Sequence, residues 1–364
     1  MEIMSYKEII IATGGTGGHI FPAYSLARYF IKNGSSVNII TDNRGMKFLK
    51  NFKDLKIEII NSETIFKKNP IYIIYSFIIV FYAIIRSFIF LLKVKPKIVF
   101  GMGGYSSFPV CLAAKMLRIP FIIYENNLVI GKANKFLLPF AKKMFVSYSE
   151  LEGVNEKYKL KIAHIGNIVR DNILNFNKKN IDFKNKQISI LVLGGSQAAK
   201  SFGEILPDIF EKCMAEEIVI KIYQQCLSSQ KENLEKKYKS MKVEYELFNF
   251  TENLLYYFDK TDLVITRAGS SMMAELLNCK IPFVSVPFPY AADNHQLKNA
   301  KFFEKKGYSF LIEEHEIGVK LFSLIKSIYK DKNLLNQMIN TQGAYSDKLV
   351  FKKIKDQIKE LIND

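Results

Sequence analysis

Short apolar runs alternate with helical patterns along almost the whole chain, and this alternation limits the possible fold more than any other feature. The apolar runs predict strands at residues 8–13, 36–41, 56–60, 97–101, 120–125, 143–148, 161–167, 188–196, 217–225, 242–248, 262–271 and 282–288. Helical patterns follow several of these runs, for example near residues 22–33 and 108–117. Strands that alternate with helices in this way predict an α/β protein with parallel sheets.

Length and composition predict two domains. The chain has 364 residues, of which 49% are hydrophobic and 24% are charged, and this is typical of a globular protein with a substantial core. The polar stretch NFNKKNIDFKNK at residues 175–186 is the predicted linker, because the strand–helix alternation starts again after it. Residues 346–364 are typical of one amphipathic helix.

The formal net charge of +17 indicates an anionic partner, which is a nucleic acid, a membrane or a phosphorylated substrate. No long run of basic residues and no zinc-finger or RNP motif is present, so nucleic acid is disfavoured. Cys111, Cys213, Cys226 and Cys279 fit neither a zinc motif nor a disulfide framework, which indicates a reducing, cytosolic compartment. The first strand begins within the first residues of the chain, so no signal peptide is expected.

Four predicted strands run into turns rich in glycine and serine. These turns are GGTGGH at residues 14–19, GMGGYSS at 101–107, GGSQAAKS at 194–201 and RAGSSMMAE at 267–275. Ligands of open α/β sheets bind outside the carboxyl ends of the strands. Backbone N–H groups at the start of the following helix favour anions, above all phosphates. The four turns therefore predict a ligand that carries phosphate.

The first of these turns matches no common nucleotide motif. GGTGGH lacks the Gly-Lys-Ser/Thr ending of a P-loop, and Ile20 stands where a dinucleotide fingerprint needs glycine. Asp42, after the second predicted strand, resembles a ribose-binding acid, so a nicotinamide-dependent oxidoreductase stays open as an alternative. The chain has no D-x-D triplet, so a metal ion held in that way is not expected.

An ordered set of motifs identifies a family. The motifs are GGTGGHIFPA, GMGGYSSFP, ENNLVIGKANK, GNIVR, LGGSQAAKSF, RAGSSMMAE and PFPYAADNHQLKNA, and together they closely resemble the MurG family of glycosyltransferases over nearly the whole chain. The resemblance implies an α/β GT-B fold, in which two Rossmann-like domains with parallel sheets face each other across a cleft. It implies an acceptor and membrane-associating domain at residues 1–166, joined by the helix at 346–364, and a UDP-sugar domain at 167–345.

The resemblance also implies the reaction. An inverting hexosyltransferase of this family moves N-acetylglucosamine from UDP-N-acetylglucosamine to the 4-hydroxyl of the muramyl unit of lipid I, which is undecaprenyl-pyrophosphoryl-MurNAc-pentapeptide. The product is lipid II, a precursor of peptidoglycan. No cofactor and no obligatory metal ion are expected.

The donor site carried over from the family lies mostly in the second half. Its residues are Arg170, Ser196, Thr251, Ser270, Ser271, Met272, Glu275 and Gln296. By resemblance, Glu275 binds the ribose hydroxyls, Gln296 contacts the sugar, and Arg170 faces the diphosphate, for which a guanidinium fork is suited. Thr251 matches a position whose backbone meets the uracil, although the family often has an apolar residue there.

The acceptor side carried over from the family lies in the first half. Thr16, Gly17, Gly18 and Asn127 match family positions that also reach the donor sugar. The backbone at Gly103 and Gly104 is expected to approach the acceptor pyrophosphate. The reaction needs a base for the acceptor hydroxyl, and His19 is the expected base, because a histidine side chain ordinarily has a pKa near neutrality and can take up a proton there. Glu125 is the alternative base.

Residues 71–92 contain one charge, Arg86, and have the length and apolarity of a membrane-spanning helix. We expect instead a peripheral protein on the cytoplasmic face of the bacterial inner membrane, because strands of one sheet are expected on both sides of this segment. A rim of basic residues would attract anionic lipid. The expected rim is Lys67, Lys68, Arg86, Lys93, Lys95 and Lys97.

Three alternatives to the leading prediction remain. A related GT-B glycolipid synthase would use a diacylglycerol acceptor. A nicotinamide-dependent oxidoreductase would bind NADH and not UDP. A membrane-anchored scaffold would depend on residues 71–92, and His19 and Glu275 would be dispensable to it.

Overall fold

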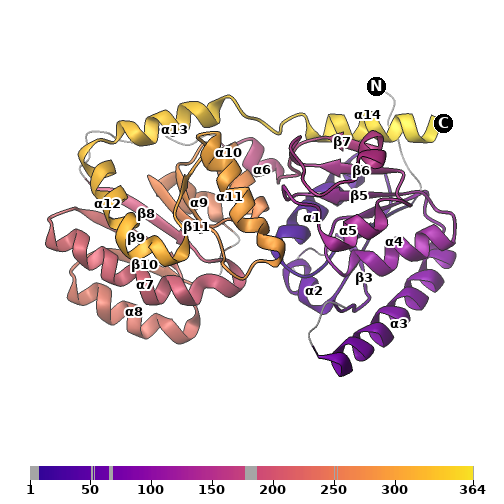
Figure 1. Ribbon diagram of the computed structural model, residues 1–364, viewed down its shortest axis with the longest axis horizontal. Coiled ribbons are helices and arrows are strands. Elements are labelled where there is room, and N and C mark those ends of the chain that lie inside the picture. The colour runs from indigo at the N-terminus through magenta and orange to yellow at the C-terminus, as the bar shows by residue number, and fades with distance from the viewer. Residues whose placement is uncertain are drawn as a thin grey trace. The chain divides into compact units, whose positions relative to one another are not determined.

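The computed structural model describes residues 8–50, 52, 54–64, 69–176, 187–249, 251 and 253–363. The chain divides into two compact units, whose elements are labelled in Figure 1. The first unit consists of Met1–Arg170 and Asp347–Asp364, and the second consists of Asp171–Ser346. Each unit is built on a parallel sheet, so the predicted α/β class is confirmed.

Among the described residues, the sheet of the first unit has seven strands in the order β3-β2-β1-β4-β5-β6-β7, and all neighbouring pairs are parallel. The strands are β1 Ile9–Ala12, β2 Val37–Thr41, β3 Lys56–Ile59, β4 Ile98–Gly101, β5 Phe121–Glu125, β6 Lys143–Val146 and β7 Ile162–His164. The chain runs outward from β1 to β3 and then returns to β4 on the other side of β1. The switch point of this sheet therefore lies between β1 and β4.

Helices cover both faces of this sheet, because alternate residues of each strand point to opposite faces. The helices are α1 Gly17–Lys32, α2 Asn43–Leu49, α3 Pro70–Val94, α4 Ser107–Met116, α5 Lys132–Leu137, the 3-10 turn η1 Glu156–Lys161, and α14 Val350–Asn363. Ile9 and Ile11 of β1 join a buried cluster with α1 and α14. Ile10 and Ala12 join a second cluster with α3 and α4. The apolar strands are thus buried on both sides.

The C-terminal helix α14 belongs to the first unit, although the second unit precedes it in the chain. Its Ile354 and Ile358 are buried in the cluster that includes α1. Phe351 stacks on Tyr29 of α1, with ring centroids 4.6 Å apart. The predicted amphipathic helix at residues 346–364 is therefore present, and its apolar face is the one that packs.

A buried carboxylate ties together the two places where the chain leaves and re-enters the first unit. Asp347 is buried, and its Oδ1 accepts a hydrogen bond of 2.9 Å from the backbone N–H of Asn167. Gly166, beside it, has a φ of 98°. A Cβ on Gly166 would lie 2.4 Å from Asp347 Oδ1, so glycine is required there by both conformation and space.

The second unit has a parallel sheet in the order β10-β9-β8-β11-β12-β13, as far as its described residues show. The strands are β8 Ile188–Leu193, β9 Ile220–Gln225, β10 Glu244–Phe248, β11 Leu263–Arg267, β12 Phe283–Val286 and β13 Phe310–Leu311. The helices are α6 Asp171–Leu174, α7 Gly195–Ala215, α8 Ser228–Ser240, α9 Leu254–Lys260, α10 Ser270–Cys279, α11 His295–Lys305, α12 Ile317–Lys330 and α13 Asn333–Gly343, with 3-10 turns η2 Ala292–Asn294 and η3 Glu314–Glu316. The switch point of this sheet lies between β8 and β11.

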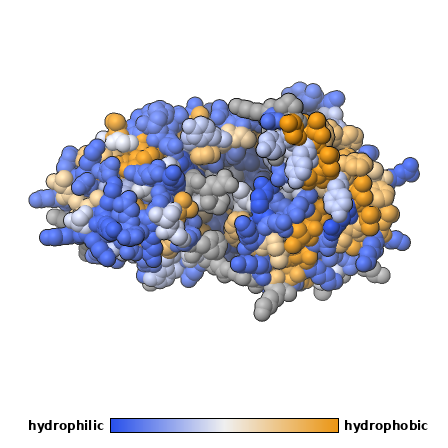
Figure 2. Space-filling model, turned by 90° about the horizontal axis from the view of Figure 1, so that it is seen from below, coloured by the Kyte–Doolittle hydropathy of each residue, from blue (hydrophilic) through white to orange (hydrophobic). Residues whose placement is uncertain are grey.

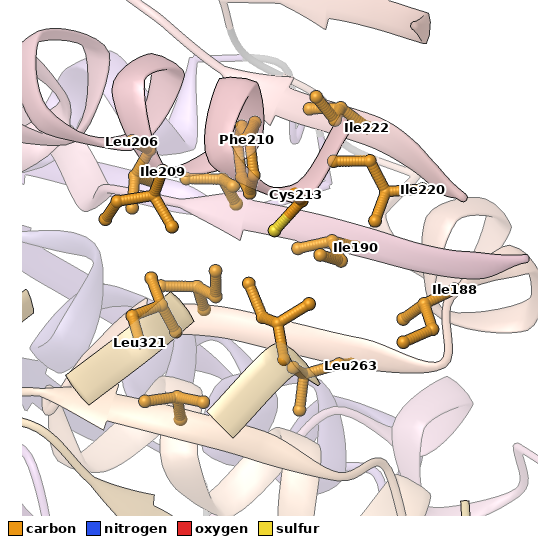
Figure 3. Packing of buried hydrophobic residues seen from close by; sticks show 14 of the residues in the cluster. Ile188, Ile190, Leu206, Ile209, Phe210, Cys213, Ile220, Ile222, Leu263 and Leu321 are labelled. Carbon is orange, nitrogen blue, oxygen red and sulfur yellow. The ribbon is translucent and has the colours of Figure 1, made fainter. Parts of the chain in front are cut away.

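The core of the second unit forms where α7 packs on the central strands (Figure 3). Phe210 and Cys213 of α7 point toward Ile190 of β8 and Ile222 of β9. Leu321 of α12 belongs to the same cluster. These side chains are fully or almost fully buried, and they hold α7 against the central strands of the sheet.

All twelve predicted strands are present. The predicted strands at 188–196 and 262–271 end earlier than expected, because the helices α7 and α10 already begin within them. The two-residue strand β13 was not predicted, since so short a run has no recognisable alternation. In the predicted linker, residues 177–186 lie outside the described part of the chain.

Helix α3 is packed on one side only. Ser76, Val80, Ala83, Ser87 and Leu91 are buried, and their spacing of three and four residues forms one stripe, with the packed helix α4 beside α3. The two serine hydroxyls donate to the carbonyls of the preceding turn, so neither is left unpaired.

The rest of α3 is exposed and apolar. Its exposed large apolar side chains are Ile71, Tyr72, Ile74, Tyr75, Phe77, Ile78, Phe81, Tyr82, Ile85, Ile89 and Leu92. Figure 2 shows apolar residues gathered on the side of the molecule where α3 lies. In the described part of the chain, this helix alone is long and apolar enough to cross a membrane, by length and composition. Only 22% of its most apolar window is buried.

Gly166→Ala should lower the free energy of unfolding by about 2 kcal/mol, because a left-handed backbone costs an L-residue about 1–2 kcal/mol and the new Cβ displaces Asp347. Urea unfolding followed by circular dichroism measures this. The control is Gly318→Ala on α12, where nothing lies within 4 Å of the added Cβ. Equal stability of the two variants would contradict the argument.

Candidate functional site

The glycine-rich loop of the first unit lies at the switch point of its sheet. It follows β1 and leads into α1, whose N-cap residue is Thr16 and whose first residue is Gly17. Gly15 has a φ of 82°. A Cβ on Gly14 would lie 2.3 Å from Ser106 Oγ, so the neighbouring loop after β4 leaves room for glycine only. The helix start at Gly17 and Gly18 presents backbone N–H groups, as anion binding requires.

His19 lies in the first turn of α1, and its ring rests on the turn after β4. A Cβ on Gly103 would lie 3.0 Å from both Cε1 and Nδ1 of the ring, and a Cβ on Gly104 would lie 3.4 Å from Cδ2. Both glycines have positive φ angles. We expected these glycines to admit the acceptor pyrophosphate, whereas the structure places the imidazole of His19 against them. Glycine at these two positions thus leaves the space in which the His19 ring lies.

Glu125 is buried at the end of β5, and both of its carboxylate oxygens are engaged. Oε1 accepts from the backbone N–H and the side-chain Nδ2 of Asn127, each at 3.1 Å. Oε2 accepts from the backbone N–H of Gly131 and from Nδ2 of Asn134, each at 2.9 Å. This geometry favours an anchoring role for Glu125, which holds Asn127 in place, over the role of a base.

Asn126 connects this loop to the glycine-rich loop. Its Nδ2 donates a hydrogen bond of 3.0 Å to the carbonyl of Gly18, and its Oδ1 accepts from Asn127 Nδ2 at 3.1 Å. The structure therefore brings together Gly18, His19 and Asn127, which come from two motifs that are far apart in the sequence. Asn126 was not predicted, and its only sequence signal was its place beside Asn127 after a strand.

Asp42 is the residue on which the alternative of a nicotinamide-dependent oxidoreductase rested. Its side chain is buried and forms hydrogen bonds within the protein. It is the N-cap of α2, and it accepts from the backbone N–H groups of Gly15 and Gly45 and from the guanidinium of Arg44. Burial by itself raises the pKa of Asp42, but these hydrogen bonds and the charge of Arg44 outweigh burial and lower the pKa below its usual range. The carboxylate is thus held ionised as a structural anchor.

Arg170 is the last residue of the first unit. Its guanidinium carbon lies 5.2 Å from the centroid of the Phe21 ring, and Phe21 is on α1. This cation–π contact places the predicted diphosphate-binding arginine near the start of the helix that also carries His19.

In the second unit, two helices begin side by side at the switch point. α7 follows β8 and contains Ser196 in its first turn. The side chain of Ser196 is not among those that the structure describes. α10 follows β11 and begins with Ser270, Ser271 and Met272. Because β8 and β11 are hydrogen-bonded neighbours, the two helix starts lie at the same point of the sheet edge. Two adjacent helix N-termini suit a diphosphate.

Glu275 lies one turn further along α10 and is buried. A spacing of four residues places it on the same face of the helix as Ser271. The turn before α10 is held by Asn299 of α11, whose Nδ2 donates to the carbonyl of Ala268 at 3.4 Å.

Gln296 lies in the first turn of α11, after β12, and its Oε1 accepts a hydrogen bond of 2.9 Å from the backbone N–H of Phe288. The turn before it contains two consecutive left-handed residues, Asp293 with a φ of 52° and Asn294 with a φ of 53°. Such backbone strain is typical of functional loops. Thr251 follows β10, the edge strand that lies two positions from β8 in the sheet.

Arg267, at the end of β11, is a residue that the sequence reasoning missed. Its side chain is 7% exposed, its Nη2 donates to Ser201 Oγ at 2.7 Å, and it forms an ion pair with Glu314. Its guanidinium carbon lies 4.5 Å from the ring centroid of Phe202 and 5.5 Å from that of Phe288. It thereby connects α7, the loop after β12 and η3. A lone cationic residue closing an apolar strand was the available signal.

Two parallel sheets, each with predicted ligand-binding loops at its switch point, are the architecture of the GT-B fold, and matches to family models show that the chain is a glycosyltransferase. The N-terminal domain model of glycosyltransferase family 28 matches residues 9–146, and the C-terminal domain model of that family matches residues 189–358. The crystal structure of Acinetobacter baumannii MurG has a TM-score of 0.75 and 25% sequence identity to this chain, and the match covers 97% of this chain and 99% of that one. A UDP-GlcNAc 2-epimerase from Neisseria meningitidis, 16% identical with a TM-score of 0.64, shares the fold alone.

The relatives found by sequence identify the family more narrowly than the shared fold does. A protein of Pelagibacter ubique named UDP-N-acetylglucosamine–N-acetylmuramyl-(pentapeptide) pyrophosphoryl-undecaprenol N-acetylglucosamine transferase is 36% identical, over 95% of this chain and 92% of its own length. A protein of Rickettsia canadensis with the same name is 34% identical, over 90% of this chain and 92% of its own length. The chain belongs to this family, the MurG glycosyltransferases.

Glu125→Gln should lower the free energy of unfolding by about 1–3 kcal/mol, because the new NH2 group faces N–H donors that lose their acceptor. Thermal unfolding measures this, with Glu156→Gln in the exposed turn η1 as the control for the same chemical change. If Glu125→Gln kept the stability of the unaltered protein and lost only turnover, Glu125 would be the base and not an anchor.

Proposed function

We propose that this protein transfers N-acetylglucosamine from UDP-N-acetylglucosamine to the muramyl 4-hydroxyl of lipid I, with inversion, to give lipid II. One observation carries this proposal: motif residues of a family whose members are named for this transfer lie in the loops after the strands of both sheets, and the glycine-rich ones lie at the switch points. The second unit is the donor domain, and the first is the acceptor domain.

The donor domain binds the UDP moiety by its helix starts. The N–H groups at the starts of α7 and α10 receive the diphosphate, and the carboxylate of Glu275 accepts hydrogen bonds from the ribose hydroxyls. Gln296 and the strained turn before it contact the sugar. As UDP leaves, charge develops on its diphosphate, and the fixed N–H groups together with Arg170 stabilise that charge.

His19 is the base in this proposal. The imidazole takes the proton of the acceptor hydroxyl as the hydroxyl oxygen attacks the anomeric carbon, and the bond from that carbon to the UDP oxygen breaks. The ring is oriented by the turn at Gly103 and Gly104, and the backbone of His19 is held by Thr13, whose Oγ1 donates to the His19 carbonyl at 3.0 Å. A single displacement of this kind inverts the configuration at the anomeric carbon.

The acceptor domain attaches to the cytoplasmic face of the inner membrane through α3. A spanning α3 is disfavoured, because β3 before it and β4 after it belong to the same sheet, and because one side of α3 is buried within the unit. The exposed apolar side of α3 enters the lipid interface. Exposed Lys93, Lys95 and Lys97 lie at its carboxyl end, whereas Lys67 and Lys68 lie outside the described residues.

The distribution of charge supports an anionic membrane surface as the partner. The first unit contains 29 of the 52 Lys and Arg residues and 14 of the 35 Asp and Glu residues, so +15 of the formal net charge of +17 lies there. The charge is therefore concentrated on the unit that contains α3, where it attracts anionic lipid headgroups.

Purified protein incubated with radiolabelled UDP-N-acetylglucosamine and a short-chain lipid I analogue should transfer label to the lipid, with and without EDTA.

In the same assay, His19→Ala should lower kcat about 100-fold or more, because the base is lost. Glu275→Ala should raise KM for the donor and abolish the rise in melting temperature caused by UDP. A folded protein that transfers no label, and that NADH stabilises while UDP does not, would overturn the proposal in favour of an oxidoreductase.

Ile78→Lys combined with Phe81→Lys should weaken binding to phosphatidylglycerol-containing vesicles about tenfold or more, because both exposed side chains leave the lipid interface. The melting temperature should stay unchanged, and the control is Val319→Lys, which changes an exposed apolar side chain of α12 in the second unit. Vesicle co-sedimentation at low and high salt measures the effect. Protein that alkaline carbonate fails to strip from membranes would contradict the peripheral assignment.

A further inference from the structure

We propose that Asp42 is a positioning residue for the transfer reaction: its buried carboxylate joins three loops and thereby holds His19 in place. This inference rests on the proposed function, since it concerns the loop that carries the base. Asp42 touches neither donor nor acceptor in this proposal. Its effect passes through the glycine-rich loop.

Each oxygen of the Asp42 carboxylate has its own set of donors. Oδ1 accepts from the backbone N–H of Gly15 at 3.1 Å and from that of Gly45 at 2.8 Å. Oδ2 accepts from Ser106 Oγ at 3.0 Å and from Nε and Nη2 of Arg44 at 2.9 and 2.7 Å. Because Asp42 is only 2% exposed, water does not compete effectively for these bonds.

These donors come from the loops after three adjacent strands. Gly15 follows β1, Gly45 lies in the first turn of α2 after β2, and Ser106 follows β4. The strands β2, β1 and β4 are consecutive in the sheet. One carboxylate therefore fixes the spacing of the loops on both sides of the switch point.

Two of these loops form the seat of His19. The loop after β1 leads into the first turn of α1, which carries His19, and the turn after β4 contains Gly103 and Gly104, against which the ring lies. Asp42 bonds to the first loop at Gly15 and to the second at Ser106. The distance between the imidazole and its seat is therefore set by bonds to Asp42.

The contact is tight, so small displacements are transmitted. A Cβ on Gly14 would lie 2.3 Å from Ser106 Oγ and 3.1 Å from Asp42 Cγ, so backbone, hydroxyl and carboxylate are already in van der Waals contact. Packed groups of this kind cannot shift independently. Loss of one hydrogen bond to Asp42 is therefore expected to displace the glycine-rich loop.

Arg44 compensates the negative charge of the Asp42 carboxylate. A buried negative charge beside a helix start whose N–H groups suit an anion would repel that anion. The Arg44 guanidinium forms two bonds with Oδ2 and neutralises the carboxylate, while 61% of the Arg44 side chain stays exposed. The anchor therefore holds the loop without leaving an uncompensated charge.

The test compares Asp42→Asn with the unaltered protein in the transfer assay. Asparagine keeps the acceptor for Gly15 and Gly45, but its NH2 group cannot accept from Ser106 or Arg44. We expect kcat with the lipid I analogue to fall about tenfold or more, because misplacement of a catalytic group is costly. The stabilisation by UDP, which reports on the donor domain, should be unchanged. The matched control is Asp54→Asn, which makes the same chemical change at an exposed carboxylate that pairs with Arg28.

Ser106→Ala provides a second variant that removes a single donor. It should change kcat in the same direction by a smaller factor, and its effect should not add fully to that of Asp42→Asn. Hydrogen exchange at residues 14–18 should accelerate in both variants and not in Asp54→Asn.

The outcomes separate this inference from the proposed function. Transfer by the unaltered protein with unchanged kcat in Asp42→Asn, even if that variant melts earlier, would show a structural role only and overturn the inference. No transfer by the unaltered protein would overturn the proposed function. Unchanged exchange at residues 14–18 in Asp42→Asn would overturn the anchoring of the loop in either case.

Discussion

The carboxyl edge of each parallel sheet is the constraint on which the rest of the structure depends. All strands of such a sheet end at the same edge, so loops far apart in the chain meet there, and their backbone N–H groups need partners. In the first unit, Asp42 and Glu125 supply acceptors to loops on both sides of the glycine-rich turn. Glycine is needed in that turn because the loops are drawn so close together.

The two units solve the same problem with anchors of opposite charge. Buried carboxylates hold the loops of the first unit, whereas Arg267 holds those of the second through Ser201 and Glu314. Each anchor lies just behind residues predicted to meet the substrates. In both units the loops that carry the predicted substrate-binding residues are therefore held by a charged group that is paired within the protein, as preorganised sites require.

Helix α3 shows why hydropathy by itself is ambiguous. A stripe of Ser76, Val80, Ala83, Ser87 and Leu91 is core, while the opposite side is apolar and exposed. An apolarity profile averages these two sides and gives the same value as a membrane-spanning helix. The distinction depends on β3 and β4, which flank α3 in the chain and lie in one sheet.

The sequence by itself determined the class of fold, the strands, the last helix and the residues at the glycine-rich turns, because periodicity and glycine placement are local properties. It also determined the family, because ordered motifs are read along the chain. Only the tertiary structure showed that both carboxylate oxygens of Glu125 and of Asp42 accept hydrogen bonds within the protein, that His19 lies against Gly103 and Gly104, and that Arg267 connects three loops. Those roles depend on hydrogen bonds between loops separated by dozens of residues, and no local pattern encodes which buried side chain will meet which backbone group.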